Sequence, residues 1–130
     1  MSFCTVINCM DGRVQVPVIN YLTKRFNVKY ADVISEPGPN RILATQMNPN
    51  LVESILNRVN ISVQNHGSVG IAIAGHHDCA GNPAGKDEQI SHIHDAIKFV
   101  HSRFAHLEII GLWVDENWEV EEVLREGNGF

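Results

Sequence analysis

The sequence predicts an α/β fold in which a mainly parallel sheet of four to five strands carries helices on both faces. Short apolar runs rich in β-branched residues, typical of strands buried on both sides, alternate with longer segments of helical periodicity. Parallel neighbours need long crossover connections, and the helical segments supply them. A chain of 130 residues fits one domain with a buried core, so we expect a three-layer single domain over residues 1–130.

The first half of the chain contains two expected strands and two expected helices. Phe3 to Asn8 and Tyr30 to Ser35 are apolar runs of strand length. Pro17 suits the first turn of a helix between them. The segment Glu36 to Asn40 contains two prolines, which lack the N–H that a strand ladder requires, so we expect a loop there. Asn50 is the expected N-cap of the second helix.

The second half of the chain continues the alternation. Val69 to Ala74 is the third expected strand, and its small residues suit close packing beneath helices. Apolar side chains between Ile90 and Phe104 recur along one face of a long helix. Glu108 to Asp115 is the fourth expected strand. Trp118 to Val123 can pair with it as a hairpin or form a last helical turn, and the sequence leaves both open.

Composition argues against several classes of function. The formal net charge is −5 and the basic residues form no stripe, so we expect no binding to nucleic acid or to an anionic membrane surface. No run approaches the roughly 18 apolar residues of a membrane span, and no signal sequence is recognisable. We therefore expect a cytoplasmic protein. In a reducing compartment, three cysteines are better explained by metal binding or catalysis than by disulfides.

Three candidate metal ligands follow the first and third expected strands. Cys9 lies just past the end of the first, and His76 and Cys79 lie just past the end of the third. If these strands are neighbours in a parallel sheet, the three side chains meet at the edge where such sheets bind ligands. Two thiolates and one imidazole suit Zn²⁺ and leave a fourth coordination position open. Cys4 lies inside the first strand, and we expect it in the core.

A carboxylate and a guanidinium follow the first candidate ligand at alternate positions. In extended backbone, alternate residues project to one side, so Cys9, Asp11 and Arg13 can line one wall of a cavity. Arg13 can then bind the Asp11 carboxylate in bidentate fashion and hold it ionised. Such a carboxylate can accept a hydrogen bond from a zinc-bound water and orient it towards an electrophile. The alternative is a surface ion pair of little energetic value.

Together, two segments resemble the signature of the β-class carbonic anhydrases. The first is Cys9-Met10-Asp11-Gly12-Arg13, and the second is Gly75-His76-His77-Asp78-Cys79-Ala80-Gly81. The resemblance covers most of the chain and implies a β-carbonic-anhydrase-like domain with strand order 2-1-3-4. It also implies a homodimer or higher homo-oligomer with the site near the subunit interface. The stretch between the third strand and the last is shorter than is usual in that family, so we expect a reduced-length member.

The resemblance implies a role for each matching residue. It makes Asp11 the hydrogen-bond acceptor for the bound hydroxide and Arg13 its anchor. In some members of the family the aspartate instead takes the fourth zinc position at rest. The family's second strand ends in a turn that lines the substrate pocket, and Gly38 corresponds to a glycine of that turn. The implied zinc ligands are Cys9, His76 and Cys79.

The sequence leaves three functions open. The first is a carbonate dehydratase, a zinc lyase that reversibly hydrates carbon dioxide to bicarbonate by a zinc-bound hydroxide. As an alternative, the altered turn after the second strand suits hydrolysis of carbonyl sulfide or carbon disulfide. The third is a zinc-binding domain without catalysis, which the shortened chain and the proline-containing turn favour.

Overall fold

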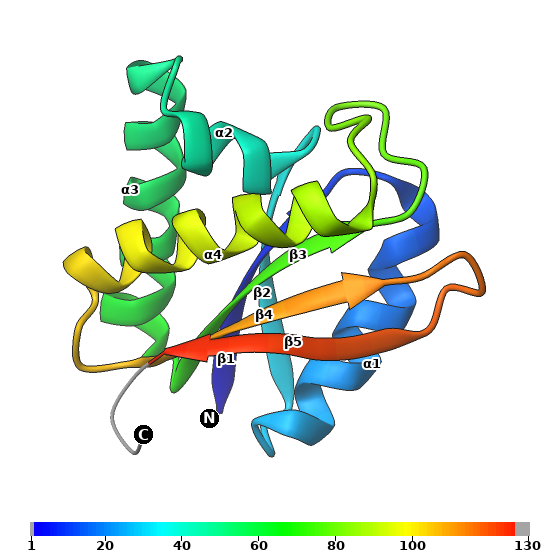
Figure 1. The fold of residues 1–130 in the computed structure, drawn as a ribbon. Helices are drawn as coiled ribbons and strands as arrows, with labels where there is room; N and C mark the ends of the chain where they lie inside the picture. The colour runs from blue at the N-terminus through cyan, green and yellow to red at the C-terminus, as the bar shows by residue number, and fades with distance from the viewer. Residues whose placement is uncertain (1, 127–130) are drawn as a thin grey trace.

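The computed structural model describes residues 2–126, in which five strands form a single sheet (Figure 1). The strands are β1 (Phe3–Cys9), β2 (Tyr30–Glu36), β3 (Gly70–His76), β4 (Glu108–Val114) and β5 (Val120–Glu126). Within the same residues, the helices are η1 (Gly12–Val14), a 3₁₀ helix, and α1 (Gln15–Arg25), α2 (Pro39–Thr45), α3 (Pro49–His66) and α4 (Lys86–Arg103). None of these helices is both long and apolar enough to cross a membrane.

The sheet has the order β2-β1-β3-β4-β5, which confirms the predicted order of the first four strands. These four run parallel to one another. β5 pairs antiparallel with β4, with an irregular register between Gly111 and Leu112, so the segment after β4 is a hairpin partner rather than a helical turn. β1 and β3 are therefore neighbours inside the sheet, and their carboxyl ends lie at the same edge.

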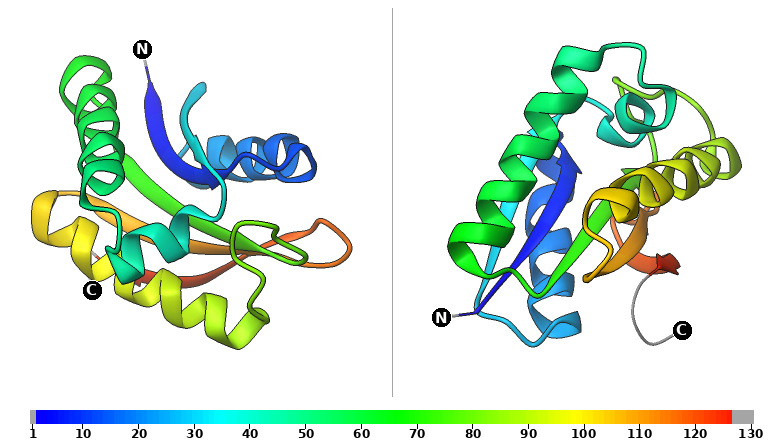
Figure 2. Two further views of the ribbon diagram at one scale, coloured as in Figure 1. Left: turned by 90° about the horizontal axis from the view of Figure 1, so that it is seen from above. Right: turned by 90° about the vertical axis from the view of Figure 1, so that its left-hand side faces the viewer.

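Helices cover both faces of the sheet and make three layers (Figure 2). On one face, α1 buries Val18 and Leu22 in a cluster that also contains Cys4 of β1, so Cys4 is in the core as predicted. On the opposite face, α2, α3 and α4 pack over a second cluster that includes Ile55 and Ile93. The central strands are buried on both sides, which places their carboxyl ends firmly relative to one another.

Two helix boundaries differ from the prediction because proline begins helices as well as ending strands. Pro39 is the first residue of α2, where the sequence predicts a loop. Proline lacks an N–H, but the first turn of a helix leaves that group without an intrahelical partner in any case. In α3 the N-cap is Asn48 rather than Asn50. The Asn48 side chain accepts the Leu51 N–H at 3.2 Å, and Pro49 follows as the first helical residue.

Candidate metal centre

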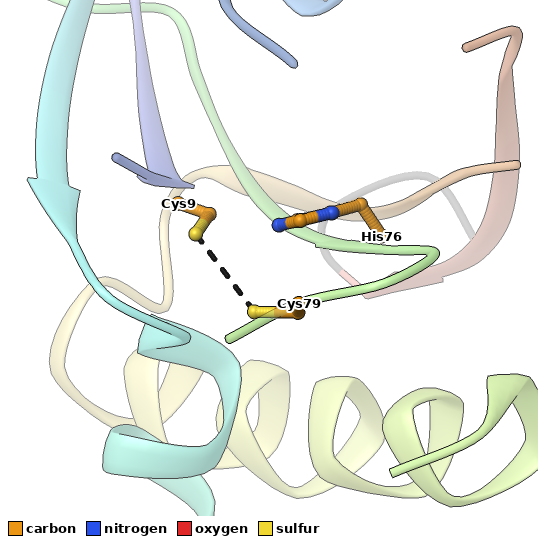
Figure 3. A group of neighbouring side chains, drawn as sticks. All are labelled: Cys9, His76 and Cys79. Carbon is orange, nitrogen blue, oxygen red and sulfur yellow. Dashed lines mark hydrogen bonds between the residues drawn. The ribbon is translucent and has the colours of Figure 1, made fainter. Parts of the chain in front are cut away.

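Cys9, His76 and Cys79 come together at the carboxyl edge of the sheet (Figure 3). Cys9 is the last residue of β1, His76 is the last residue of β3, and Cys79 lies in the loop that follows β3. The two Sγ atoms are 3.8 Å apart, and the three ligand atoms lie within 4.8 Å of one another. All three side chains are buried. The structure thus brings together the residues whose positions after β1 and β3 predict a common site.

The imidazole of His76 has one nitrogen available to a cation. Its Nδ1 lies 2.7 Å from the carbonyl oxygen of His77, and because a carbonyl can only accept, Nδ1 carries the proton. The other nitrogen, Nε2, is buried and has no hydrogen-bond partner. Buried polar atoms are almost always paired, so an unpartnered nitrogen beside two sulfurs indicates a ligand position. Figure 3 shows the ring directed toward the Cys9 sulfur.

Backbone N–H groups donate hydrogen bonds to both sulfurs. The donors are Gly38 and Asp11 for Cys9, and Gly81 and Asn82 for Cys79. The hydrogen bond between the two cysteine side chains lowers the pKa of Cys9 well below its usual range, and the same bond, together with burial, raises the pKa of Cys79. The two sulfurs thus share one proton, and the backbone N–H donors favour the thiolate form of each, whereas burial opposes it. A cation that replaced this proton would bind two thiolates that hydrogen bonds from backbone N–H groups already stabilise.

This donor set fits zinc. Thiolate and imidazole ligands suit Zn²⁺ and are poor ligands for Mg²⁺ and Ca²⁺, which prefer oxygen. The unpartnered Nε2 of His76 supplies the nitrogen that such a site requires. Among residues 2–126, no fourth histidine, cysteine or carboxylate joins the group. Three protein ligands with an open fourth position are typical of catalytic zinc sites rather than structural ones.

Asp11 and Arg13 form the predicted bidentate pair, although the predicted backbone geometry is wrong. Arg13 Nε and Nη2 donate to the two carboxylate oxygens of Asp11 at 3.0 and 2.7 Å. The chain is not extended at this point, because Asp11 is the N-cap of η1 and its side chain accepts the Arg13 backbone N–H at 2.9 Å. The hydrogen bonds from Arg13 lower the pKa of Asp11 to about 2, so the carboxylate is ionised at neutral pH.

Two further segments hold Arg13. Its Nη2 donates to the backbone carbonyl of Asp78 at 3.1 Å, and its Nη1 donates to the Asp78 carboxylate at 3.3 Å. The guanidinium also lies over the ring of Trp118, 4.4 Å from the ring centroid. Trp118 is on the turn between β4 and β5. The sequence does not single out Trp118, because this contact joins segments far apart in the chain. Asp11 is therefore held by an arginine whose own position is fixed from two other loops.

Gly38 lies where two loops meet. Its φ of +62° is in the left-handed region, and a Cβ atom added to it would lie 2.6 Å from the carbonyl carbon of Gly81. The turn after β2 and the loop after β3 therefore touch backbone to backbone. The Gly38 N–H also donates a hydrogen bond to the Cys9 sulfur. Gly38 is thus beside the three candidate ligands, and its contact with substrate stays a prediction.

A buried network of amide side chains supports the loops of the candidate site. It consists of Asn40 in α2, Asn82 in the loop after β3 and Gln89 in α4, none more than 1% exposed. The sequence prediction names Asn40 only as part of the turn after the second strand and does not include Asn82 or Gln89. One signal for Gln89 is present, since it lies four residues before Ile93 on the apolar face of its helix. A polar side chain at a core position indicates a buried hydrogen-bond partner.

Known proteins resemble this chain in sequence family and in fold. A family model described as "Putative carbonic anhydrase" matches residues 1–124. One of two tetrameric β-carbonic anhydrases from the filamentous ascomycete Sordaria macrospora aligns with a TM-score of 0.56 and 15% identity, over 95% of this chain and 82% of that chain. The β-carbonic anhydrase CafA of Aspergillus fumigatus aligns with a TM-score of 0.48 and 11% identity, over 92% and 74% of the two chains. No curated protein matches the chain.

Proposed function

This chain belongs to the β-class carbonic anhydrase family, and on that premise we propose that it catalyses the reversible hydration of carbon dioxide to bicarbonate. In this proposal, zinc is held by Cys9, His76 and Cys79. The observation that carries the proposal is the buried group of these three side chains, in which Nε2 of His76 has no other partner. When bound, zinc acidifies a coordinated water and so supplies a nucleophile at neutral pH.

Asp11 is proposed to orient the nucleophile. Because hydrogen bonds from Arg13 keep the Asp11 carboxylate ionised, its oxygens can only accept a hydrogen bond. A nucleophile that donates a hydrogen bond to Asp11 points a lone pair elsewhere, which favours attack on the carbon of the substrate. Arg13 acts through Asp11, and its contacts with Asp78 and Trp118 keep the pair in place. The side chain of Asp11 is 20% exposed, which supports a position at the border of the site.

Gly38 is proposed to border the substrate. Its backbone N–H donates a hydrogen bond to the Cys9 sulfur, and the turn that contains it packs against the backbone of Gly81. Carbon dioxide is small and apolar, so a wall of backbone without side chains leaves room for it close to the ligands. The contact with Gly81 also leaves no space for a side chain at this position.

Stopped-flow measurement of carbon dioxide hydration tests the proposed activity. The zinc-loaded parent is compared with Cys9→Ser, which loses one soft ligand, and with Cys4→Ala, which changes a buried cysteine inside β1. We expect the parent and Cys4→Ala to hydrate carbon dioxide and Cys9→Ser to lose at least about 100-fold in rate. A parent rate no better than that of Cys9→Ser would rule out catalysis.

Two further measurements distinguish the alternative functions. Sulfide release from carbonyl sulfide or carbon disulfide, faster than bicarbonate formation from carbon dioxide, would support the related substrates. About one zinc ion per chain without any of these reactions would support a binding domain without catalysis. Metal content is therefore measured on the same protein samples as the rates.

We also propose a homodimer or higher homo-oligomer with the site near the interface. Two exposed apolar side chains lie close in sequence to the candidate ligands: Met10, next to Cys9, is 63% exposed, and Val16 in α1 is 66% exposed. The similar proteins of Sordaria macrospora are tetrameric. A second copy on this face would bury both side chains and keep water away from the site.

Sedimentation velocity tests the assembly. Val16→Glu places a charge on the proposed interface, so we expect a smaller particle than the parent forms. Met47→Glu is the matched control, because Met47 is 83% exposed between α2 and α3, away from Met10 and Val16 in the chain, and we expect it to leave the mass unchanged. A parent that stays monomeric at all concentrations would contradict the proposal.

A further inference from the structure

Gln89 is a fully buried polar side chain in the first turns of α4. Its exposed fraction is 0%, and both ends of its amide make hydrogen bonds. Long polar side chains are seldom completely buried, since desolvation costs free energy unless each group is paired. The partners of Gln89 show what this burial achieves.

Gln89 pairs with both backbone groups of His76. The His76 N–H donates to Oε1 at 3.2 Å, and Nε2 donates to the His76 carbonyl at 2.9 Å. This double contact imitates the pairing of a neighbouring strand and holds the end of β3, from which the imidazole projects. Gly75 makes the approach possible, because a Cβ atom there would lie only 2.9 Å from Oε1 of Gln89.

The same amide holds the loop that contains Cys79. Nε2 of Gln89 also donates to the carbonyl oxygens of Asn82 and Ala84, at 3.2 and 3.0 Å. The backbone N–H of Asn82 in turn donates to the Cys79 sulfur. Gln89 therefore acts on the second cysteine through the loop whose amides surround its sulfur.

Through Asn40, Oε1 of Gln89 is connected to the segment that positions the third candidate ligand, Cys9. Asn40 Nδ2 donates to Oε1 of Gln89 at 3.2 Å, and Asn40 Oδ1 accepts from Asn82 Nδ2 at 3.2 Å. Asn40 lies two residues after Gly38, whose N–H donates to the Cys9 sulfur. One buried amide thus connects the segments that position all three candidate ligands.

We propose that Gln89 is a positioning residue that sets the zinc affinity and ligand geometry of the Cys9, His76 and Cys79 site. The proposal rests on the proposed function, since it requires that zinc binds there. The position needs a donor group whose two hydrogens are shared by three carbonyl oxygens and an acceptor for two N–H groups, and a neutral amide side chain offers both at this length. A glutamate lacks the donor, and a methionine of similar shape lacks both.

Zinc affinity and the absorption spectrum of the cobalt-substituted protein test the proposal. We expect Gln89→Met to weaken zinc binding by about tenfold, measured by competition with a chromophoric chelator, and to shift the cobalt bands, because the ligands are held less well. Ser62→Ala is the matched control. Its hydroxyl is also buried and bonds to Thr5 and Asp32, but it lies on α3 near the middle of β1, away from the ligands. We expect Ser62→Ala to change zinc affinity by less than about twofold, even if it lowers stability equally.

Asn40→Ala provides a second test of the proposal, and this test remains available if Gln89→Met does not fold. It removes one partner of Oε1 and leaves both His76 contacts, so we expect a smaller loss of affinity, about threefold, and little further loss when it is combined with Gln89→Met. If the folded Gln89 or Asn40 variants have the same zinc affinity and the same cobalt spectrum as the parent, the inference is overturned and the proposed function stays intact. A parent that binds no zinc at Cys9, His76 and Cys79 would overturn both.

Discussion

The turn at Gly38 should tolerate no side chain, for two reasons that can be separated by experiment. Its φ is +62°, which L-residues with a Cβ rarely adopt. A Cβ atom there would also lie 2.6 Å from the carbonyl carbon of Gly81 and 2.9 Å from the backbone nitrogen of Asn82. Both contacts are with backbone, which cannot move aside as a flexible side chain can.

Three other glycines separate the two effects. Gly67, the C-cap of α3, has a φ of +63° but open space around its Cβ position, so Gly67→Ala measures the backbone cost alone. Gly81 has no left-handed φ, but a Cβ atom on it would lie 2.4 Å from the carbonyl carbon of Pro37, so Gly81→Ala measures the overlap alone. Gly12 has neither feature and serves as the control.

The expected losses of unfolding free energy follow from these geometries. A left-handed alanine costs about 1–2 kcal/mol, so Gly67→Ala should lose that amount. Forced overlap in a packed region costs about 1–3 kcal/mol, which is the expectation for Gly81→Ala. Gly38→Ala combines both and should lose about 2–5 kcal/mol. Gly12→Ala should stay within about 0.5 kcal/mol of the parent.

Urea unfolding in reducing buffer, with the slope checked for constancy, measures these losses. Zinc affinity measured on the same samples adds a second criterion, because the N–H groups of Gly38 and Gly81 donate to the cysteine sulfurs. Both substitutions should weaken zinc binding, whereas Gly67→Ala should not. If Gly38→Ala costs no more stability than Gly67→Ala, the close approach of the two loops cannot be as described.

Three further predictions concern the Asp11 pair and the start of α3. Arg13→Lys loses the bidentate contact and should lower kcat/KM for hydration by about tenfold, and a rate equal to the parent's would contradict a role for the pair. The Asp11 carboxyl should titrate near pH 2 by NMR, below its ordinary pKa of 3.8. The contact between Asp11 and Arg13 therefore stabilises the fold above pH 3.8, and this contribution is lost as the pH falls toward 2. In an Arg13→Gln variant, the pKa of Asp11 should return towards 3.8. Asn48→Ala should cost about 1 kcal/mol in urea unfolding and Asn50→Ala less than about 0.5 kcal/mol, whereas the reverse order would return the N-cap to Asn50.

The sheet could be predicted because its signals are local. The apolar, β-branched runs of β1 and β3 show strand structure without reference to any partner, and both end at candidate ligands. The proline-rich turn was harder. Pro37 and Pro39 both exclude a continued strand, but only the packing of α2 on the sheet and on α4 made Pro39 the start of a helix.

The pairing of Asp11 with Arg13 was predicted correctly from the wrong backbone. Residue types alone favour a bidentate contact between a carboxylate and a guanidinium at this spacing. The 3₁₀ turn of η1 achieves it because the Asp11 side chain also caps the turn. Trp118 completes the support of Arg13 from a distant turn, and no pattern near either residue indicates it.

The sequence by itself determined which side chains can bind a soft cation and that they follow the ends of two strands, because residue type and periodicity are properties of short segments. The tertiary structure alone decided that Nε2 of His76 is the free nitrogen, that amides surround both sulfurs and that Gln89 connects the loops. These features depend on hydrogen bonds between segments far apart in the chain, and such contacts exist only after the strands and helices have packed.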